Sequence, residues 1–366
     1  MRHPFLRRLA RAALARTLSP EDIVAVIPWE RIGGPRDSED LARAAGTMLE
    51  KLSSDVVADH LYEKLTAGPT ESGWTAQMAA LHERWRPRGL QVLPEHFYTP
   101  VFDPERLTDS VWSARFETGV RYDAGEQLSL WRRVHRFGDE LAAFPEDPDG
   151  LPDEARRFFW RNSEFSHQDA VLYYSLIRHL RPARVIEVGG GFSTLLAAEA
   201  AARNGQTRID CIEPYPRPFL ATEIPGVRLH AASVLEVPLD FFRDLADGDI
   251  LFIDCSHVSK TGSDVNHLLL RVVPSLRSGV WVHVHDIFLP FEYPREWPLQ
   301  RLYFNEQYVL AGLLANSAAL EVMIANYFLM RVAPAALREF SVPGRNVSLG
   351  GASFWMRTRP AGAMAE

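Results

Sequence analysis

From residue 156 onward, short apolar runs alternate with amphipathic helical stretches. This alternation is typical of βαβ units and a parallel sheet. Five runs have the short, bounded character of strands buried on both faces: Ala183–Val188, Arg208–Glu213, Val227–Ala231, Asp249–Asp254 and Val280–His285. We therefore predict an α/β fold over residues 156–366, with a mainly parallel sheet of about seven strands flanked by helices.

Two further β-rich runs follow the fifth one, at Leu320–Met330 and Ala352–Thr358. No strong helical pattern separates them, so we predict that they form an antiparallel hairpin at one edge of the sheet.

The first part of the chain has a different pattern. Helical periodicity dominates from Glu21 to about Phe144. The segment Phe144–Ala155 concentrates Pro, Gly and acidic residues and is the best candidate linker. We place a domain boundary there, with a helical region over residues 1–155 that covers the substrate side of the domain over residues 156–366.

Charge and cysteine content narrow the class of partner. The net charge of -7 argues against nucleic acid, because binding to a phosphate backbone relies on surplus Lys and Arg. Two cysteines within apolar runs indicate reduced thiols and a cytoplasmic protein.

The basic segment over residues 1–18 is interpreted as a solvated helix, with weak membrane-surface contact as the alternative. No run is long enough to span a membrane, and a homo-oligomer stays open.

Residues at the carboxyl ends of the predicted strands carry the chemistry, because ligands of open α/β sheets bind there. The first strand runs into the glycine-rich turn Glu187–Thr194, where glycines let a ligand approach the backbone and Ser193 or Thr194 can cap the next helix. Thr194 occupies a position where a dinucleotide fingerprint needs Gly or Ala, which disfavours a nicotinamide cofactor. Glu187 suits a ligand with an ammonium group. Glu213 lies where an acid commonly binds ribose hydroxyls, with a solvated strand-end acid as the alternative.

These motifs resemble class I S-adenosylmethionine-dependent methyltransferases of the branch called methyltransferase family 24. The resemblance rests on several stretches along about three-quarters of the chain: Glu187–Thr194, Glu213, Phe252–Asn266, Val282–Ile287, Pro290–Pro294 and Asn305–Tyr308, with fainter similarity at His96–Pro100 and Asp169–Ala170. It implies a Rossmann-like fold and S-adenosylmethionine as methyl donor. The implied donor-binding residues are Glu187, Gly189, Gly190, Gly191, Ser193, Thr194, Glu213, Ser233 and Asp254.

Transfer of a methyl group to oxygen requires that the acceptor hydroxyl be positioned and lose its proton. His257 follows the fourth strand and is the predicted general base, with Asp254 beside it. Asp254 and Asp286 end neighbouring strands and can share a divalent cation such as Mg²⁺, Mn²⁺ or Fe²⁺. Metal-dependent O-methyltransferases carry an acid where this chain has His285, so a softer ion is favoured if His285 is a ligand. His283 lies on the same strand face, and one of the two histidines is expected to be a core residue.

An aromatic and polar stretch after the fifth strand is predicted to line the acceptor site, although aromatic stripes more often belong to a core. The predicted acceptor residues are Glu292, Tyr293, Trp297, Asn305 and Tyr308, with His96, Phe97 and Tyr98 from the first region. The sequence thus predicts methylation of a hydroxyl oxygen on a sugar or other small molecule. The alternatives are a catalytically silent protein that retains the cofactor pocket and, less favoured, a nicotinamide-dependent oxidoreductase.

Overall fold

The computed structural model describes residues 98–162, 164–165 and 167–360. The chain divides into two compact units, Met1–Pro94 and Glu95–Glu366. The boundary predicted near residue 155 falls inside the second unit, so the helices between residues 98 and 155 belong to the same unit as the sheet. His96, Phe97 and the basic segment over residues 1–18 lie outside the described residues.

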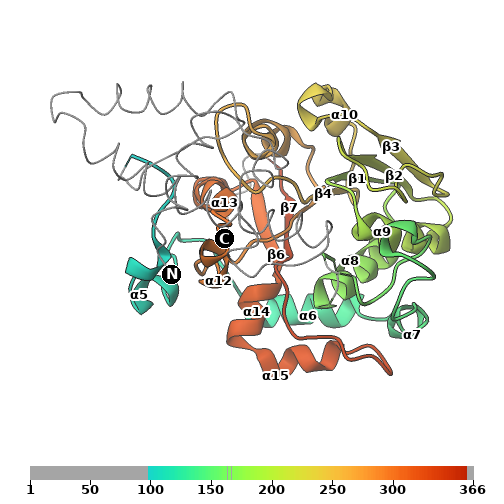
Figure 1. The fold of residues 1–366 in the computed structure, drawn as a ribbon, viewed down its shortest axis with the longest axis horizontal. Coiled ribbons are helices and arrows are strands. Elements are labelled where there is room, and N and C mark those ends of the chain that lie inside the picture. The colour runs from blue at the N-terminus through green and yellow to red at the C-terminus, as the bar shows by residue number, and fades with distance from the viewer. Residues whose placement is uncertain (1–97, 163, 166, 361–366) are drawn as a thin grey trace, which may run out of the picture. The chain divides into compact units, whose positions relative to one another are not determined.

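A seven-stranded sheet forms the centre of the second unit (Figure 1), in the order β3-β2-β1-β4-β5-β7-β6. The strands are β1 Arg184–Val188, β2 Arg208–Ile212, β3 Val227–His230, β4 Ile250–Ile253, β5 Trp281–Val284, β6 Leu320–Ala325 and β7 Phe354–Thr358. The first five are parallel, and β7 runs antiparallel to both β5 and β6. The predicted fold class and the antiparallel edge pair are therefore confirmed.

Helices surround this sheet (Figure 1), and all successive parallel strands except β2 and β3 have a helix between them. Their bounds are α5 Asp109–Trp112, α6 Ala124–Val134, α7 Gly138–Ala142, α8 His167–Leu180, α9 Phe192–Asn204, α10 Leu239–Arg243, α11 Asp264–His267, α12 Glu296–Leu299, α13 Glu306–Ala315, α14 Asn326–Val332 and α15 Pro334–Leu337. Gly205 closes α9 in the left-handed conformation, as its place after Asn204 predicts.

The predicted strand Leu320–Met330 is wrong in its second half. β6 ends at Ala325, and Asn326–Val332 forms α14, which with α15 separates β6 from β7. An apolar run alone does not distinguish a buried strand from a buried helix. In this case the helical turn buries Phe328 and Leu329 together, which a strand would have placed on opposite faces.

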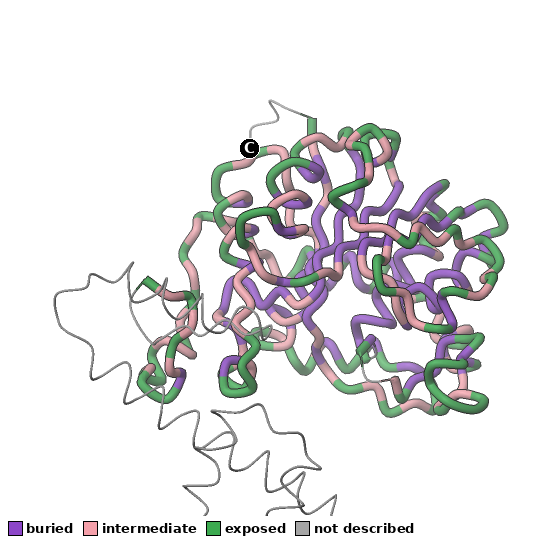
Figure 2. Tube along the Cα trace, turned by 45° about the horizontal axis from the view of Figure 1, so that its top comes forward, coloured by how far each residue is buried: buried purple, intermediate pink, exposed green. Residues whose placement is uncertain are grey.

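The core extends through the strands and the inward faces of the helices (Figure 2). On α8, the ring of Tyr173 stacks on Phe252 of β4 with ring centroids 4.4 Å apart. On α6, the ring of Trp131 stacks on Phe340 at 4.6 Å. Because Trp131 is fully buried, α6 is part of the same core as the sheet and cannot be treated as an appendage.

Candidate active site

The turn between β1 and α9 contains three consecutive glycines with different roles. Gly189 has a φ of 87°, and a Cβ there would collide with the backbone carbonyl of Asp254. A Cβ on Gly190 would overlap the Sγ of Cys211. A Cβ on Gly191 would meet no heavy atom of the described residues within 4 Å. Packing therefore requires the first two glycines, whereas Gly191 borders open space that a ligand can occupy.

Polar groups hold this turn in place. Thr194 Oγ1 accepts a hydrogen bond from the Gly191 amide at 3.1 Å, so Thr194 caps α9 from inside its first turn. Glu213 follows β2, and its carboxylate accepts hydrogen bonds from the amides of Gly190 at 3.2 Å and Tyr215 at 2.7 Å. Ser233 follows β3 and caps a short helix by accepting from the Leu235 amide at 3.3 Å. Glu213 is thus fixed directly beside the glycine turn.

Glu187 lies on β1 and is completely buried. Neither of its carboxyl oxygens has a hydrogen-bond partner among the described residues. Burial raises the pKa of Glu187 to about 7. The side chains of Thr194 and Ser193, which are also buried, lower this pKa, but by less than burial raises it. An unsatisfied buried carboxyl group is costly, and a donor-rich group such as an ammonium would satisfy it.

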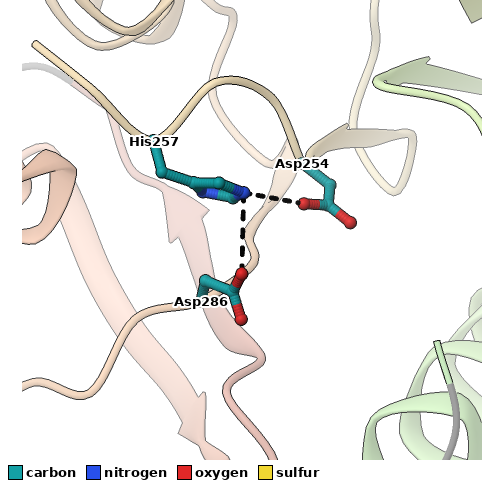
Figure 3. A group of neighbouring side chains, drawn as sticks. All are labelled: Asp254, His257 and Asp286. Atoms are coloured by element: carbon teal, nitrogen blue, oxygen red, sulfur yellow. Dashed lines mark ion pairs between the residues drawn. The ribbon is translucent and has the colours of Figure 1, made fainter. Parts of the chain in front are cut away.

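Asp254, His257 and Asp286 converge where β4 and β5 end (Figure 3). His257 Nε2 lies 3.3 Å from Asp254 Oδ1 and 3.5 Å from Asp286 Oδ2. One ligand atom from each of these three residues lies within 4.8 Å of the other two. His257 and Asp286 both have a φ of 58°, which directs their side chains toward one another at a backbone cost. These three residues were predicted from the sequence, and the structure brings them together.

The other ring nitrogen of His257 has a partner that sequence reasoning missed. Nδ1 lies 3.0 Å from Oε2 of Glu306, the first residue of α13, which is 1% exposed. Burial opposes protonation of His257, but hydrogen bonds to Asp254 and Glu306 outweigh it and raise the pKa of His257 to about 10. Burial also raises the pKa of Glu306. The only sequence signal for Glu306 was its place between Asn305 and Tyr308.

His283 on β5 and His285, just past its end, lie near each other but have different surroundings. His283 is fully buried, stacks on Phe252 at 4.1 Å and bonds through Nε2 to Ser353 Oγ at 2.9 Å, so it is the core histidine. His285 Nδ1 lies 3.3 Å from Asp286 Oδ1 and 3.9 Å from Asp254 Oδ2. Burial opposes the charge on His285, but Asp254 and Asp286 raise its pKa.

The far side of His285 faces another buried acid, Asp169 in the first turn of α8. His285 Nε2 lies 3.4 Å from Asp169 Oδ2. Burial opposes ionisation of Asp169, but His285 and the amides of Asn326 and Ala352 lower its pKa to about 2. Sequence reasoning noted Asp169 only within a faint family similarity and gave it no role.

Four of the predicted acceptor residues belong to one aromatic cluster or lie at its end. Trp297 and Tyr293 join an aromatic cluster that reaches His257 through Phe304, whose ring centroid lies 4.7 Å from the His257 ring. Tyr308 and Glu292 are hydrogen-bonded to each other at the outer end of this cluster.

Asn305 and Tyr98 are placed differently. Asn305 Oδ1 accepts from the Ser259 amide at 2.6 Å, so its side chain holds the loop after His257 in place. Tyr98 is 70% exposed. Neither position indicates acceptor contact.

Residues 186–287 match a family model described as a methyltransferase domain. An uncharacterized protein from Archaeoglobus fulgidus is 30% identical over 169 residues, which are 43% of this chain and 75% of that protein. The sheet order, the glycine turn and the polar cluster at its carboxyl edge together define an α/β methyltransferase. The chain belongs to the class I S-adenosylmethionine-dependent methyltransferase family.

Solved structures with a similar arrangement include a putative O-methyltransferase from Klebsiella pneumoniae, with 14% identity, a TM-score of 0.34, and coverage of 66% of this chain and 92% of that chain. Another is the O-methyltransferase TomG from Streptomyces achromogenes, involved in tomaymycin synthesis and solved with S-adenosylmethionine. It has 19% identity, a TM-score of 0.32 and the same two coverages. These likenesses are too distant to assign a substrate. Within the described residues, no helix has the length and apolar character needed to cross a membrane.

Proposed function

We propose that this methyltransferase transfers the methyl group of S-adenosylmethionine to a hydroxyl oxygen of a small molecule, such as a sugar or another hydroxylated metabolite. The observation that carries the proposal is the meeting of Asp254, His257 and Asp286 at the carboxyl ends of β4 and β5. A hydroxyl group must lose its proton as it attacks the sulfonium carbon, whereas a neutral amine attacks without prior deprotonation. A cluster of imidazole and carboxylates therefore suits oxygen better than nitrogen.

The donor pocket is proposed to lie over the turn between β1 and α9. Gly191 leaves space for the ligand, Glu213 is oriented to accept from ribose hydroxyls, and Glu187 supplies an unsatisfied carboxyl group for the ammonium. Ser233 stands at the end of β3 on the same edge of the sheet. Together these residues fit the donor's ammonium and ribose groups.

Proton removal is the step for which the cluster is suited. His257 is the proposed base: Nδ1 donates to Glu306, which orients the ring, and Nε2, which faces Asp254 and Asp286, would take up the hydroxyl proton when the ring is neutral. The ligand atoms of Asp254, His257 and Asp286 also fit a divalent cation. Such a cation would lower the pKa of an acceptor hydroxyl. The two aspartates and His257 would position that hydroxyl beside the donor's methyl group.

The acceptor is proposed to lie against the aromatic cluster next to His257. Phe304 and Trp297 are half-buried and offer faces on which a sugar or an aromatic ring can pack. The chain before the predicted boundary also reaches this side, because the Phe116 amide bonds to the Pro290 carbonyl at 2.7 Å. The acidic charge balance supports a small molecule over nucleic acid, and the free thiols Cys211 and Cys255 support a cytoplasmic protein.

Thermal-shift measurements on the full chain test the donor first. S-adenosylmethionine and S-adenosylhomocysteine are expected to raise the melting temperature and NAD is not, because only a ligand that binds the folded state stabilises it. A screen of hydroxylated metabolites that follows release of S-adenosylhomocysteine then identifies the acceptor. Stabilisation by NAD alone would contradict the proposed donor, and transfer only to amines would contradict the hydroxyl acceptor.

A further inference from the structure

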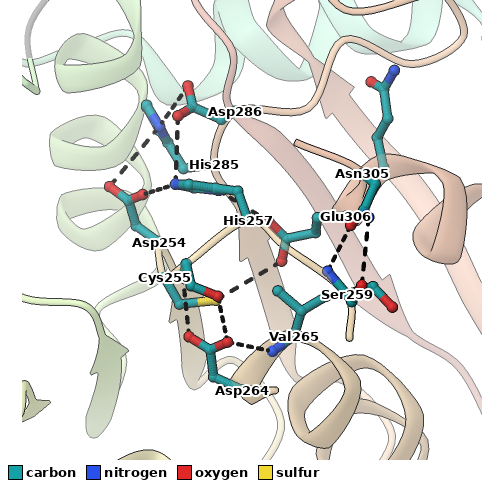
Figure 4. Close-up of polar contacts among 12 residues, drawn as sticks. Asp254, Cys255, His257, Ser259, Asp264, Val265, His285, Asp286, Asn305 and Glu306 are labelled. Carbon is teal, nitrogen blue, oxygen red and sulfur yellow. Dashed lines mark hydrogen bonds and ion pairs between the residues drawn. The ribbon is translucent and has the colours of Figure 1, made fainter. Parts of the chain in front are cut away.

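The first turn of α13 lies against the loop that carries His257 (Figure 4). The backbone amides of Asn305 and Glu306 both donate to the His257 carbonyl, at 3.1 and 3.2 Å. The Asn305 side chain accepts from the amide of Ser259, two residues after His257, at 2.6 Å. Glu306 Oε2 lies 3.0 Å from His257 Nδ1. This turn therefore holds both the backbone and the ring of His257.

Gln307, the next residue of the same turn, holds the loop that follows Asp286. It is completely buried, and its Oε1 accepts from the Phe288 amide at 3.0 Å. Its Nε2 donates to the Phe291 carbonyl at 3.4 Å, and its backbone amide donates to the Tyr293 hydroxyl at 3.1 Å. Phe288 is only two residues past Asp286. Successive helix residues point about 100° apart, so neighbouring side chains of this turn can reach different loops.

The loops that carry His257 and Asp286 need support of this kind. Both residues have a φ of 58°, a conformation that strains any residue with a Cβ. Asp286 and Asp254 both face His257 Nε2, and two carboxylates at such short range repel each other. Loops without support would relax out of the strained conformation, and His257 Nε2 would move away from the acceptor hydroxyl.

We propose that Asn305 and Gln307 are positioning residues of the active site. The first turn of α13, residues 305–307, forms a clamp that sets the separation of His257 and Asp286. Asn305 acts on the loop after β4, and Gln307 acts on the loop after β5. The inference rests on the proposed function, because it takes His257 Nε2 as the group that removes the acceptor's proton.

The clamp is continuous with the proposed acceptor wall. Phe304, directly before it, packs on the His257 ring with ring centroids 4.7 Å apart. Tyr308, directly after it, is hydrogen-bonded to Glu292. An acceptor that packs on these aromatic rings therefore contacts the same stretch of chain that holds the base.

Three substitutions in the full chain test the clamp. Asn305→Ala removes the hydrogen bond from Ser259, whereas Asn305→Asp keeps an oxygen that accepts it. Gln307→Met removes the hydrogen bonds of the buried amide at nearly the same volume. Turnover is followed as release of S-adenosylhomocysteine with the acceptor found in the metabolite screen.

We expect Asn305→Ala and Gln307→Met to lower kcat by about 100-fold, the cost of misplacing a reacting group by about 1 Å. Asn305→Asp should restore most of the turnover. Affinity for S-adenosylhomocysteine should stay within about 2-fold of the natural value in all three variants, because distant sites act independently. Full turnover in Asn305→Ala would overturn the proposal, as would an Asn305→Asp variant as slow as Asn305→Ala.

A matched control lies at the other end of the same helix. Asn316 follows the last residue of α13, and its Nδ2 donates to the Gly312 carbonyl at 2.9 Å. Asn316→Ala makes the same chemical change as Asn305→Ala and should leave kcat unchanged. If it lowers kcat as much, the loss is a general effect on α13 and the proposal is overturned.

Two readouts need no acceptor and so separate the clamp from the proposed function. In the natural chain, the proton on His257 Nδ1 should give a slowly exchanging, strongly downfield NMR resonance, because it bonds to a buried carboxylate. The resonance is assigned by its absence in His257→Ala. It should be lost in Asn305→Ala and kept in Asn305→Asp.

Crystal structures provide the second readout. Gln307→Met should increase the separation of His257 Nε2 from Asp286 Oδ2, which is 3.5 Å in the natural chain. An unchanged separation in this variant, or an unchanged His257 resonance in Asn305→Ala, would overturn the clamp. Failure to bind S-adenosylhomocysteine, or to find any acceptor, would count against the proposed function and not against the clamp.

Discussion

Replacing Glu187 with glutamine tests whether this buried carboxyl group limits the stability of the fold. Burial raises the pKa of Glu187 from 4.5 to about 7. Between these values the unfolded chain releases the proton while the folded chain keeps it, so the unfolded state binds fewer protons and stability falls as pH rises. A rise of this size corresponds to about 3 kcal/mol, which is fully expressed above pH 7. Glutamine has no proton to release and should remove this loss.

The measurement is urea denaturation of the natural chain and of Glu187→Gln at pH 5 and pH 8. Other groups titrate in this range, but both chains share them, so the difference between the two chains isolates Glu187. We expect the variant to gain about 2 kcal/mol of unfolding free energy relative to the natural chain between the two pH values. S-adenosylhomocysteine should bind the variant about 10-fold more weakly, because an amide cannot pair with the ligand's ammonium as a carboxylate does.

Glu199→Gln on α9 is the control, because it makes the same chemical change at a carboxylate paired with Arg157 and Arg203. It should show no gain on going from pH 5 to pH 8 and no change in ligand affinity. If Glu187→Gln loses stability with rising pH as steeply as the natural chain, the buried carboxyl group is not the cause and the reasoning fails.

Two further predictions concern the glycine turn and the domain boundary. Gly191→Val should still fold, with a loss of at most about 1 kcal/mol of unfolding free energy at the start of α9. Calorimetry should nevertheless find no binding of S-adenosylhomocysteine to this variant. An affinity equal to that of the natural chain would place the pocket elsewhere. A chain that begins at Glu95 should fold and bind the donor. A chain that begins at Pro152 should give the circular dichroism spectrum of an unfolded protein, because it loses Trp131 from the core at a cost of about 3–5 kcal/mol. A folded, ligand-binding chain from Pro152 would contradict this.

The meeting of Asp254 and Asp286 was predictable from the sequence. Parallel strands place their carboxyl ends on one edge of a sheet, so acids that end two neighbouring strands meet there. The glycine turn was also predictable as a close approach of backbone to ligand. The different roles of its three glycines could not be predicted from the sequence. The Asp254 carbonyl and the Cys211 thiol exclude side chains at Gly189 and Gly190, and both groups come from distant parts of the chain.

Glu306 and Asp169 escaped prediction for a different reason. Each is the kind of acid found in the first turn of many helices, where it commonly interacts only with the helix dipole. Nothing in the local sequence distinguishes such an acid from one that backs a histidine on a distant loop. Asn305 stays a predicted acceptor residue, and its hydrogen bond from the Ser259 amide could not be read from the sequence because the two residues are far apart along the chain.

Backbone strain gives an independent reason to treat the cluster as functional. His257 and Asp286 both adopt a φ of 58°, where a residue with a Cβ costs about 1–2 kcal/mol and glycine costs almost nothing. The conformation of His257 is held by its own carbonyl, which accepts hydrogen bonds from the amides of Asn305 and Glu306 at 3.1 and 3.2 Å. A loop that needed only the turn would be more stable with glycine at both positions. Keeping an imidazole and a carboxylate at these two strained positions is reasonable only if the side chains act together, which is what the proposed proton removal from the acceptor requires of them.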